Sequence, residues 1–67
     1  MGFSETIKKI RQQELLTQDE FAKAVGVSFA TVNRWEAGKT IPSFKAKKLI
    51  NTYCKENGIE FSREELF

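Results

Sequence analysis

The sequence of 67 residues contains no histidine, one proline and one cysteine, and no long run of apolar residues. Cys54 alone cannot form an internal disulfide, and without histidine no Cys/His zinc set can be assembled. Nothing approaches the roughly 20 apolar residues that a membrane span needs, and residues 1–11 are charged and amphipathic, unlike a secretion signal. These absences predict a cytoplasmic protein with no metal, no cofactor, no membrane partner and no evident small-molecule ligand.

The short chain also limits the class of protein. A length of 67 residues gives room for one domain, residues 1–67. An enzyme is not expected, because the sequence has no histidine and no glycine-rich loop for phosphate, and is too short to enclose a substrate. Cys54 is interpreted as a small buried side chain, since no histidine is present to activate it as a nucleophile. A binding function is therefore favoured over catalysis.

Positive charge is unevenly distributed along the sequence. The net charge is only +2, but residues 1–54 carry nine Lys or Arg against five acidic residues, whereas residues 55–67 carry two against four. A basic body with an acidic tail suits the docking of a polyanion on the body. An ordinary solvated surface would give a similar count, so charge alone does not assign the function.

Capping residues and apolar spacing predict an all-α fold. Five polar residues stand where helix N-caps are expected: Ser4, Thr17, Ser28, Ser43 and Ser62. Thr17 and Glu20 have the spacing of a capping box. The second, third and fourth helices are expected to stop at Gly26, Gly38 and Asn57-Gly58. The result is a compact bundle of four or five helices, and only residues 59–61 alternate as a short strand would.

The connection between the second and third predicted helices is diagnostic of a helix-turn-helix over about residues 17–37. In this motif two helices cross at about 90–120° and are joined by a short turn. Ala22 provides a small residue at the close approach of the helices, and Gly26 provides one that tolerates positive φ. Val32 and Trp35 supply the inner face, and their spacing places Trp35 in the core rather than on a base-stacking surface. The predicted core comprises Val25, Val32, Trp35, Leu49 and Ile50.

The segment Leu16-Thr17-Gln18 through Trp35-Glu36-Ala37-Gly38-Lys39-Thr40-Ile41-Pro42-Ser43 resembles the lambdoid phage repressor and Cro family of helix-turn-helix domains, of XRE type. The resemblance implies a cytoplasmic transcriptional regulator, a repressor, that binds operator half-sites of double-stranded DNA as a homodimer. It also implies a buried ion pair between the first helix and the end of the third. Arg11 and Glu36 stand at the matching positions, and two solvated surface charges are the alternative.

Base contacts are predicted on the outward side of the third helix, opposite the buried positions. The candidates are Phe29, Ala30, Asn33 and Arg34. Asparagine pairs with the N6/N7 edge of adenine, arginine grips O6/N7 of guanine, and apolar side chains meet thymine methyl groups. Three alternatives remain open. Asn33 and Arg34 can be ordinary solvated surface residues, Arg34 can equally reach a phosphate, and Phe29 can pack against the second helix.

Phosphate contacts are predicted from helix N-termini, whose unpaired N–H groups and dipole attract anions. The candidates at the starts of the second, third and fourth helices are Thr17, Gln18, Ser28, Ser43 and Phe44. The family resemblance adds Lys39 and Thr40, which correspond to positions that clamp the DNA backbone.

The tail, residues 58–67, is acidic and carries apolar side chains. In the family, the dimer forms through the surface that follows the fourth helix. The residues at this place in the sequence are Ile59, Phe61, Leu66 and Phe67. These residues could instead cover the core of their own domain. The tail also supports an alternative function, a protein-interaction module such as an antitoxin whose C-terminal segment binds a partner protein.

Overall fold

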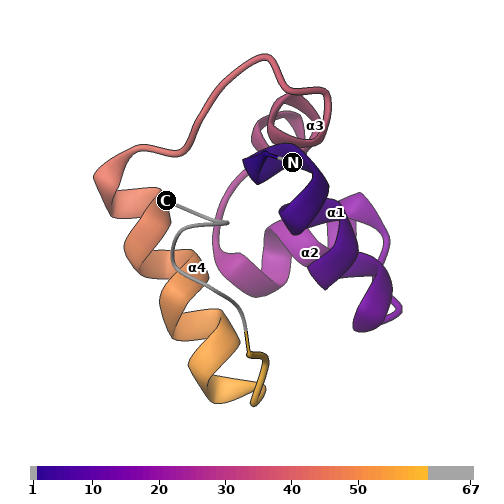
Figure 1. The fold of residues 1–67 in the computed structure, drawn as a ribbon, viewed down its shortest axis with the longest axis vertical. Helices are drawn as coiled ribbons and strands as arrows, with labels where there is room; N and C mark the ends of the chain where they lie inside the picture. The colour runs from indigo at the N-terminus through magenta and orange to yellow at the C-terminus, as the bar shows by residue number, and fades with distance from the viewer. Residues whose placement is uncertain (1, 61–67) are drawn as a thin grey trace.

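The computed structural model describes residues 2–60, which form four helices and no strand (Figure 1). The helices are α1 (Phe3–Gln13), α2 (Gln18–Val25), α3 (Phe29–Glu36) and α4 (Phe44–Glu56). Figure 1 shows α1, α2 and α3 gathered on one side, while α4 stands on the other side after an extended connection. The expected all-α fold is confirmed, and the fifth helix expected after Ser62 lies outside the described residues.

Side-chain caps begin three of the four helices. Thr17 Oγ1 accepts a hydrogen bond of 3.1 Å from the Glu20 N–H, and Glu20 Oε1 accepts one of 2.9 Å from the Thr17 N–H. The hydroxyls of Ser28 and Ser43 each accept a hydrogen bond of 3.2 Å from the backbone N–H three residues later. The caps predicted for α2, α3 and α4 are therefore confirmed, and each ties the start of a helix to a defined residue.

The first helix begins differently from the prediction. Gly2 is its N-cap and makes no side-chain cap, while Ser4 lies inside the first turn, so the assignment of Ser4 as the cap was wrong. Phe3 accounts for the earlier start, because its ring packs edge-on against Trp35 with centroids 5.6 Å apart. With Gly2 instead of Ser4 as its N-cap, α1 begins two residues earlier than predicted, and this places Phe3 in the helix beside the core.

Two glycines act where a positive φ is required. Gly26 ends α2 with a φ of +99°, and its N–H donates to the Ala22 carbonyl at 2.8 Å. Gly38 follows α3 with a φ of +75°, while the N–H groups of Gly38 and Lys39 donate to the carbonyls of Trp35 and Arg34, each at 3.1 Å. This pair of bonds is a Schellman motif, which closes the helix and turns the chain away from it.

The end of α1 uses the same motif without a glycine. The Leu16 N–H donates to the Arg11 carbonyl at 3.1 Å, and the Leu15 N–H donates to the Gln12 carbonyl at 3.0 Å. Leu15 therefore occupies the left-handed position with a φ of +58°, and its side chain is 90% exposed. A leucine here bears a backbone cost without gaining any burial.

The core lies between the four helices and consists of small and large apolar side chains. Its buried members are Ile7, Ile10, Phe21, Ala22, Val25, Val32, Trp35, Ala46, Ile50, Tyr53 and Cys54. Leu49 was predicted to be a full core member but is only partly buried, because it lies at the edge of α4 beside Phe44 and Lys48. No helix within residues 2–60 combines the length and apolarity needed to cross a membrane.

Candidate nucleic-acid interface

The turn between α2 and α3 sets the position of α3 relative to the rest of the molecule. Ala22 is 1% exposed at the packing of these two helices, so a larger side chain would separate them. Val32 and Trp35 face the core from α3 and are 0% and 2% exposed. With its inner face buried in this way, α3 presents its opposite face to solvent.

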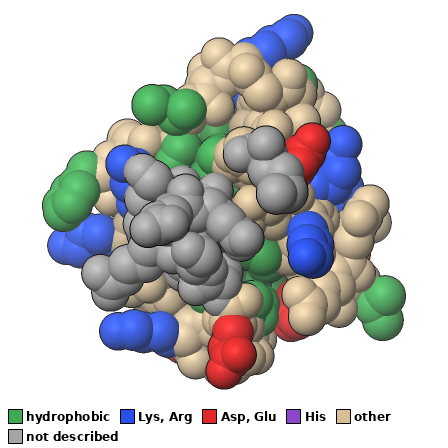
Figure 2. Space-filling model, viewed as in Figure 1, with side chains coloured by type: hydrophobic (Ala, Val, Ile, Leu, Met, Phe, Trp, Pro, Cys, Tyr) green, Lys and Arg blue, Asp and Glu red, His purple; other side chains and the backbone are tan. Residues whose placement is uncertain are grey.

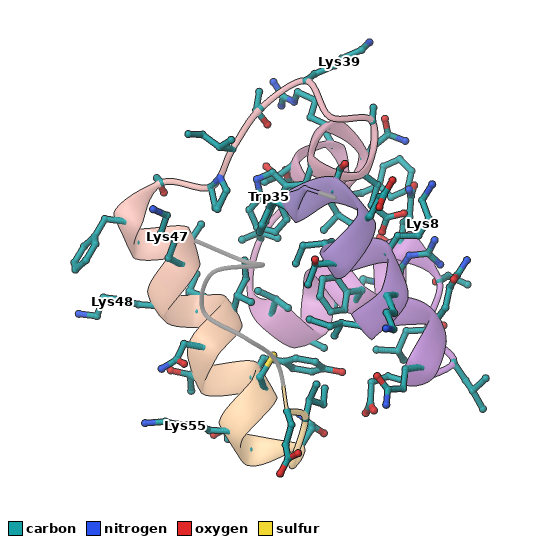
Figure 3. All side chains as sticks on the ribbon, viewed as in Figure 1. Lys8, Trp35, Lys39, Lys47, Lys48 and Lys55 are labelled. Atoms are coloured by element: carbon teal, nitrogen blue, oxygen red, sulfur yellow. The ribbon has the colours of Figure 1, made fainter. Side chains whose placement is uncertain are left out.

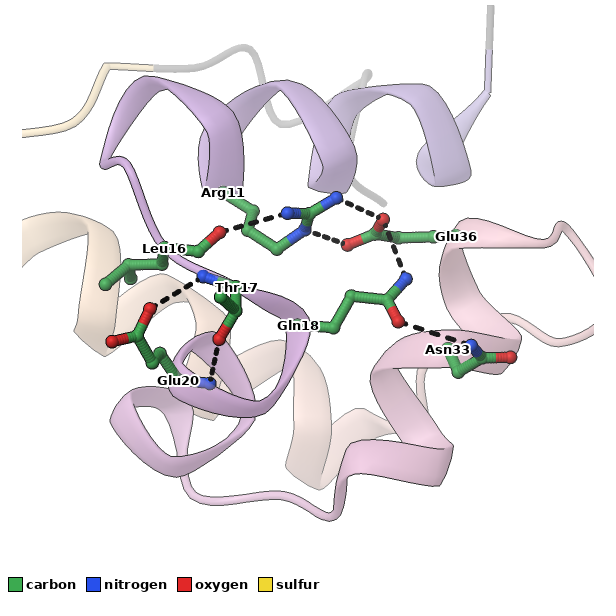
Figure 4. Close-up of polar contacts among 7 residues, drawn as sticks. All are labelled: Arg11, Leu16, Thr17, Gln18, Glu20, Asn33 and Glu36. Carbon is green, nitrogen blue, oxygen red and sulfur yellow. Dashed lines mark hydrogen bonds and ion pairs between the residues drawn. The ribbon is translucent and has the colours of Figure 1, made fainter.

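An ion pair joins α1 to the end of α3 (Figure 4). Arg11 Nε donates to Glu36 Oε2 at 2.7 Å, and Arg11 Nη2 donates to Glu36 Oε1 at 3.0 Å. Arg11 Nη1 donates to the Leu16 carbonyl at 3.0 Å, which also ties down the turn before α2. The side chains are 17% and 3% exposed, so the alternative of two solvated charges does not describe this pair.

The ion pair also shifts the pKa values of Glu36 and Arg11. Burial by itself raises the pKa of Glu36, but hydrogen bonds from Arg11 and Gln18 and the charges of Arg11 and Lys8 outweigh it, so the pKa lies below its ordinary value of 4.5. The hydrogen bond to Glu36 raises the pKa of Arg11 above its ordinary value. Glu36 is therefore a carboxylate at neutral pH, with oxygens that only accept hydrogen bonds.

The polar network continues from the ion pair to the outer face of α3. Gln18 Nε2 donates to Glu36 Oε1 at 3.1 Å, and Asn33 Nδ2 donates to Gln18 Oε1 at 3.2 Å (Figure 4). The structure thus brings together Gln18, a predicted phosphate contact at the start of α2, and Asn33, a predicted base contact on α3. Sequence reasoning named both residues but not their contact.

The four predicted base contacts all lie on the exposed part of α3. Ala30, Asn33 and Arg34 are exposed, and the side chain of Phe29 is 49% exposed. Phe29 therefore divides its surface between the protein and solvent. Arg34 Nε donates to the Ala30 carbonyl at 3.4 Å, a long bond that holds the guanidinium only loosely.

A cleft between α3 and the start of α4 groups a base-contact candidate with two phosphate candidates. Its volume is about 250 Å³, and Arg34, Thr40 and Ser43 are among its lining residues. Thr31 also lines the cleft, and its hydroxyl lies 2.8 Å from the Ser28 hydroxyl. Sequence reasoning missed Thr31, although its position one helical turn before Arg34 places both on one side of α3.

The loop after α3 carries the remaining candidates. Lys39 lies at the outer end of this loop and points away from the molecule (Figure 3). Phe44, at the first position of α4, is 78% exposed, with the Lys48 ammonium 5.8 Å from its ring centroid. Ile41 is 80% exposed in the same region, an exposed apolar side chain that sequence reasoning did not identify.

Basic side chains do not merge into one patch on the face shown in Figure 2, where Lys and Arg lie as separate groups, most of them near the edge. Lys48 and Lys55 project from α4 on the side away from the other helices, far from Lys39 (Figure 3).

Part of the predicted dimer surface has a role within its own domain. The Ile59 N–H donates to the Cys54 carbonyl at 2.8 Å beyond α4, and the Ile59 side chain is partly buried against the core. Phe61, Leu66 and Phe67 lie outside the described residues.

The single cysteine belongs to the core and not to this exposed surface. Cys54 is 1% exposed, and burial, aided by the charge of Glu14, raises the pKa of its thiol to about 11. Within residues 2–60 no group of three or more His, Cys, Asp or Glu is arranged to hold a metal. The exposed face of α3, its loop and the cleft beside it therefore form the candidate site.

Comparison with known protein families matches residues 7–53 to the helix-turn-helix family. The chain belongs to this family. The helix-turn-helix chain is also 32% identical, over 53 residues, to the HTH-type transcriptional activator BcrR of Enterococcus faecalis. The match covers 79% of this chain but only 26% of that protein, so the chain spans about a quarter of the relative's length. A search of solved structures gave no significant match.

Proposed function

We propose that this helix-turn-helix chain binds double-stranded DNA sequence-specifically, with α3 in the major groove, and regulates transcription in the cytoplasm. The observation that carries the proposal is the division of α3 into a buried inner face and an outer face bearing Phe29, Asn33 and Arg34. A major groove about 12 Å wide admits one α-helix, whose exposed side chains then meet the base edges. The name of the Enterococcus relative supports a role in transcription.

The proposed contacts are of two kinds: readers, which contact base edges, and clamps, which contact phosphates. Asn33 binds adenine, Arg34 binds guanine, and Phe29 and Ala30 contact thymine methyl groups. The clamps hold phosphates from the helix starts and the loop, and comprise Thr17, Gln18, Ser28, Lys39, Thr40, Ser43 and Phe44. Arg34 shares a cleft with Thr40 and Ser43, which supports a phosphate contact as an alternative role for Arg34.

A dimer is proposed from the size of the domain. Its Cα atoms extend 26 × 24 × 21 Å, whereas half-sites read by such motifs lie about 34 Å apart. One copy can therefore occupy one half-site, and two copies are needed for a palindromic operator. Phe61, Leu66 and Phe67 are proposed as the contact, with Ile59 contributing whatever surface its own core leaves open.

Repression is the proposed regulatory outcome, because occupying a site that overlaps a promoter requires nothing beyond DNA binding. Activation, the activity in the relative's name, would need a further contact with the transcription machinery. A reporter with the selected site placed over or upstream of a promoter separates the two outcomes.

A protein-interaction module is the second candidate function. Ile41 and Phe44 favour it, since they are 80% and 78% exposed close together in sequence. Such apolar exposure is typical of surfaces that another protein covers. In that case the acidic tail would contact a protein partner such as a toxin.

Selection of bound fragments from a random duplex pool, followed by titration, tests the proposal. We expect one recurring half-site and a complex of two chains per palindrome by sedimentation. The double variant Asn33→Ala, Arg34→Ala should lose that preference while keeping its fold. Lys55→Ala is the matched control, since it removes a charge at the far end of α4. Recovery of no preferred sequence, with no salt-dependent binding to any duplex, would overturn DNA binding in favour of the protein-interaction module.

A further inference from the structure

An asparagine side chain can read two different bases, depending on which way its amide faces. Adenine presents an acceptor, N7, beside a donor, the N6 amino group, in the major groove. Guanine presents two acceptors, N7 and O6. An amide that offers its oxygen and one N–H hydrogen matches adenine, whereas one that offers both N–H hydrogens matches guanine. Base choice therefore depends on what holds the amide of Asn33.

Packing does not hold this amide, because Asn33 is exposed on α3. Its hydrogen bond is to Gln18 Oε1, at 3.2 Å. The orientation of Gln18 is set in turn by Glu36, which accepts a hydrogen bond of 3.1 Å from Gln18 Nε2. Two amides in series thus connect the exposed reader to a carboxylate that is 3% exposed.

The direction of every bond in this series follows from the charge at its inner end. Ionised Glu36 can only accept, and Arg11 keeps it ionised by donating two hydrogen bonds to it. Gln18 must therefore direct its amino group to Glu36 and its oxygen to Asn33. Asn33 must use one N–H hydrogen toward Gln18, which leaves its oxygen and its other N–H hydrogen for a base.

We propose that the Arg11–Glu36 ion pair, acting through Gln18, orients the Asn33 amide so that it reads adenine in preference to guanine. This inference rests on the proposed function, in which Asn33 meets a base edge. Gln18 is then a positioning residue for base readout, in addition to its proposed contact with a phosphate.

Two substitutions at position 18 should change the base preference of Asn33 in different ways. Gln18→Ala removes the connection, so the Asn33 amide can rotate and the preference between adenine and guanine should collapse. Gln18→Lys places a donor-only group there, which satisfies Glu36 and donates to the Asn33 oxygen. Both N–H hydrogens of Asn33 then face the base, and the preference should invert to guanine. Gln13→Lys adds the same charge on exposed α1 and is the matched control.

The experiment measures relative affinity for duplexes that differ at one base pair. That base pair is the one at which Asn33→Ala loses its preference in selection from a random pool. We expect the parent and Gln13→Lys to prefer adenine by roughly fivefold to a hundredfold. Gln18→Ala should fall to within about threefold of no preference, and Gln18→Lys should favour guanine. A reduced affinity for all duplexes would reflect the lost phosphate contact and does not affect these ratios.

A second measurement works without DNA. In the free protein, the side-chain amide resonances of Asn33 should shift between the parent and Gln18→Ala, while backbone resonances of the core stay in place. Unchanged Asn33 resonances would overturn the inference, as would an adenine preference that survives in both Gln18 variants. A parent that selects no sequence at all would overturn the proposed function itself, and that result is visible before any variant is compared.

Discussion

The two faces of α3 place neighbouring residues in opposite environments. Val32 and Trp35 are 0% and 2% exposed, whereas Asn33 and Arg34, which lie between them in sequence, are exposed. The inner pair is held by close packing on all sides, which tolerates little change in volume. Each side chain of the outer pair makes a hydrogen bond, Asn33 to Gln18 and Arg34 to the Ala30 carbonyl. One helix therefore combines a closely packed inner face with an exposed outer face that carries polar side chains.

The outer face is itself divided. Asn33 is connected through Gln18 to a buried carboxylate, while the side chain of Arg34 has, among residues 2–60, a single hydrogen bond of 3.4 Å to its own helix. Asn33 is thus organised before any ligand arrives, and Arg34 can still adjust its position. Under the proposed function, the held Asn33 side chain would bind a base at a smaller entropic cost, whereas the more mobile Arg34 would serve a base or a phosphate.

The largest expected loss of stability comes from a substitution on the inner face of α3. Trp35→Ala should lower the free energy of unfolding by about 3–5 kcal/mol, because it removes the largest buried side chain and its edge contact with Phe3. A domain this small has little more stability than that, so it should be largely unfolded. Arg34→Ala, one residue earlier on the outer face, should stay within about 0.5 kcal/mol of the parent. Urea unfolding followed by circular dichroism measures both, and equal midpoints would contradict the division of the helix.

The next largest loss of stability should come from breaking the ion pair between Arg11 and Glu36. Arg11→Ala should lower the free energy of unfolding by about 3 kcal/mol, because it leaves the Glu36 carboxylate buried without its cation. The partial exposure of Arg11 places this value at the lower end of the range for such pairs. The double variant Arg11→Met, Glu36→Met is the control, since it removes both charges and should recover most of the loss. A double variant no more stable than Arg11→Ala would show that the charge was not the cause.

The same pair predicts the effect of pH on stability. Folding lowers the pKa of Glu36 below 4.5, so its contribution is fully present above pH 4.5. That contribution is lost as the pH falls from 4.5 through the lower value in the folded state. The melting temperature should therefore decline in this acidic range, and Glu36→Gln should show a shallower decline from a lower starting point. Parallel pH profiles for the two proteins would contradict this assignment.

Contacts with DNA should separate the outer face from the loop beyond it. Asn33→Ala or Arg34→Ala should weaken binding to the selected site by about 1–3 kcal/mol and relax preference at particular bases. Lys39→Ala should weaken selected and scrambled duplexes alike and reduce the log–log salt slope by about one unit per chain. Titration of each variant on both duplexes at several salt concentrations measures this. If Arg34→Ala lowers both affinities equally, its role is on the phosphates.

Local features were predictable from sequence where one short segment determines them. The Thr17–Glu20 capping box and the positive φ of Gly26 each depend on residues within one or two turns. The contact between Gln18 and Asn33 depends on a separation of 15 residues and on the angle between two helices. It could not be predicted from spacing alone. The partial burial of Ile59 likewise depends on how the chain turns back after α4.

The left-handed turn at Leu15, just after α1, could not be predicted for a different reason. A Schellman motif is identified in sequence by its glycine or asparagine, and Leu15 is neither. Gly38 holds the equivalent position after α3, with a φ of +75° against +58° at Leu15. The two helix ends therefore differ as the two faces of α3 do. Gly38 adopts a left-handed backbone without a steric cost, whereas Leu15 adopts it at a cost.

The smallest predicted effect exploits this mismatch. Leu15→Gly should raise the free energy of unfolding by about 0.5–1 kcal/mol, since relief of a left-handed leucine, about 1–2 kcal/mol, exceeds the added flexibility of the unfolded chain. No burial is lost, because Leu15 is 90% exposed. Leu15→Ala is the control, since alanine bears a similar left-handed cost and should leave stability nearly unchanged.

Gly38→Ala should have the opposite sign, a loss of about 1–2 kcal/mol, although the added Cβ would lie 3.8 Å from Ser4 Oγ without a clash. Thermal unfolding resolves these changes, at about 4–8 °C per kcal/mol for a domain of this size. A Leu15→Gly variant that melts below Leu15→Ala would mean that the leucine side chain contributes contacts of its own.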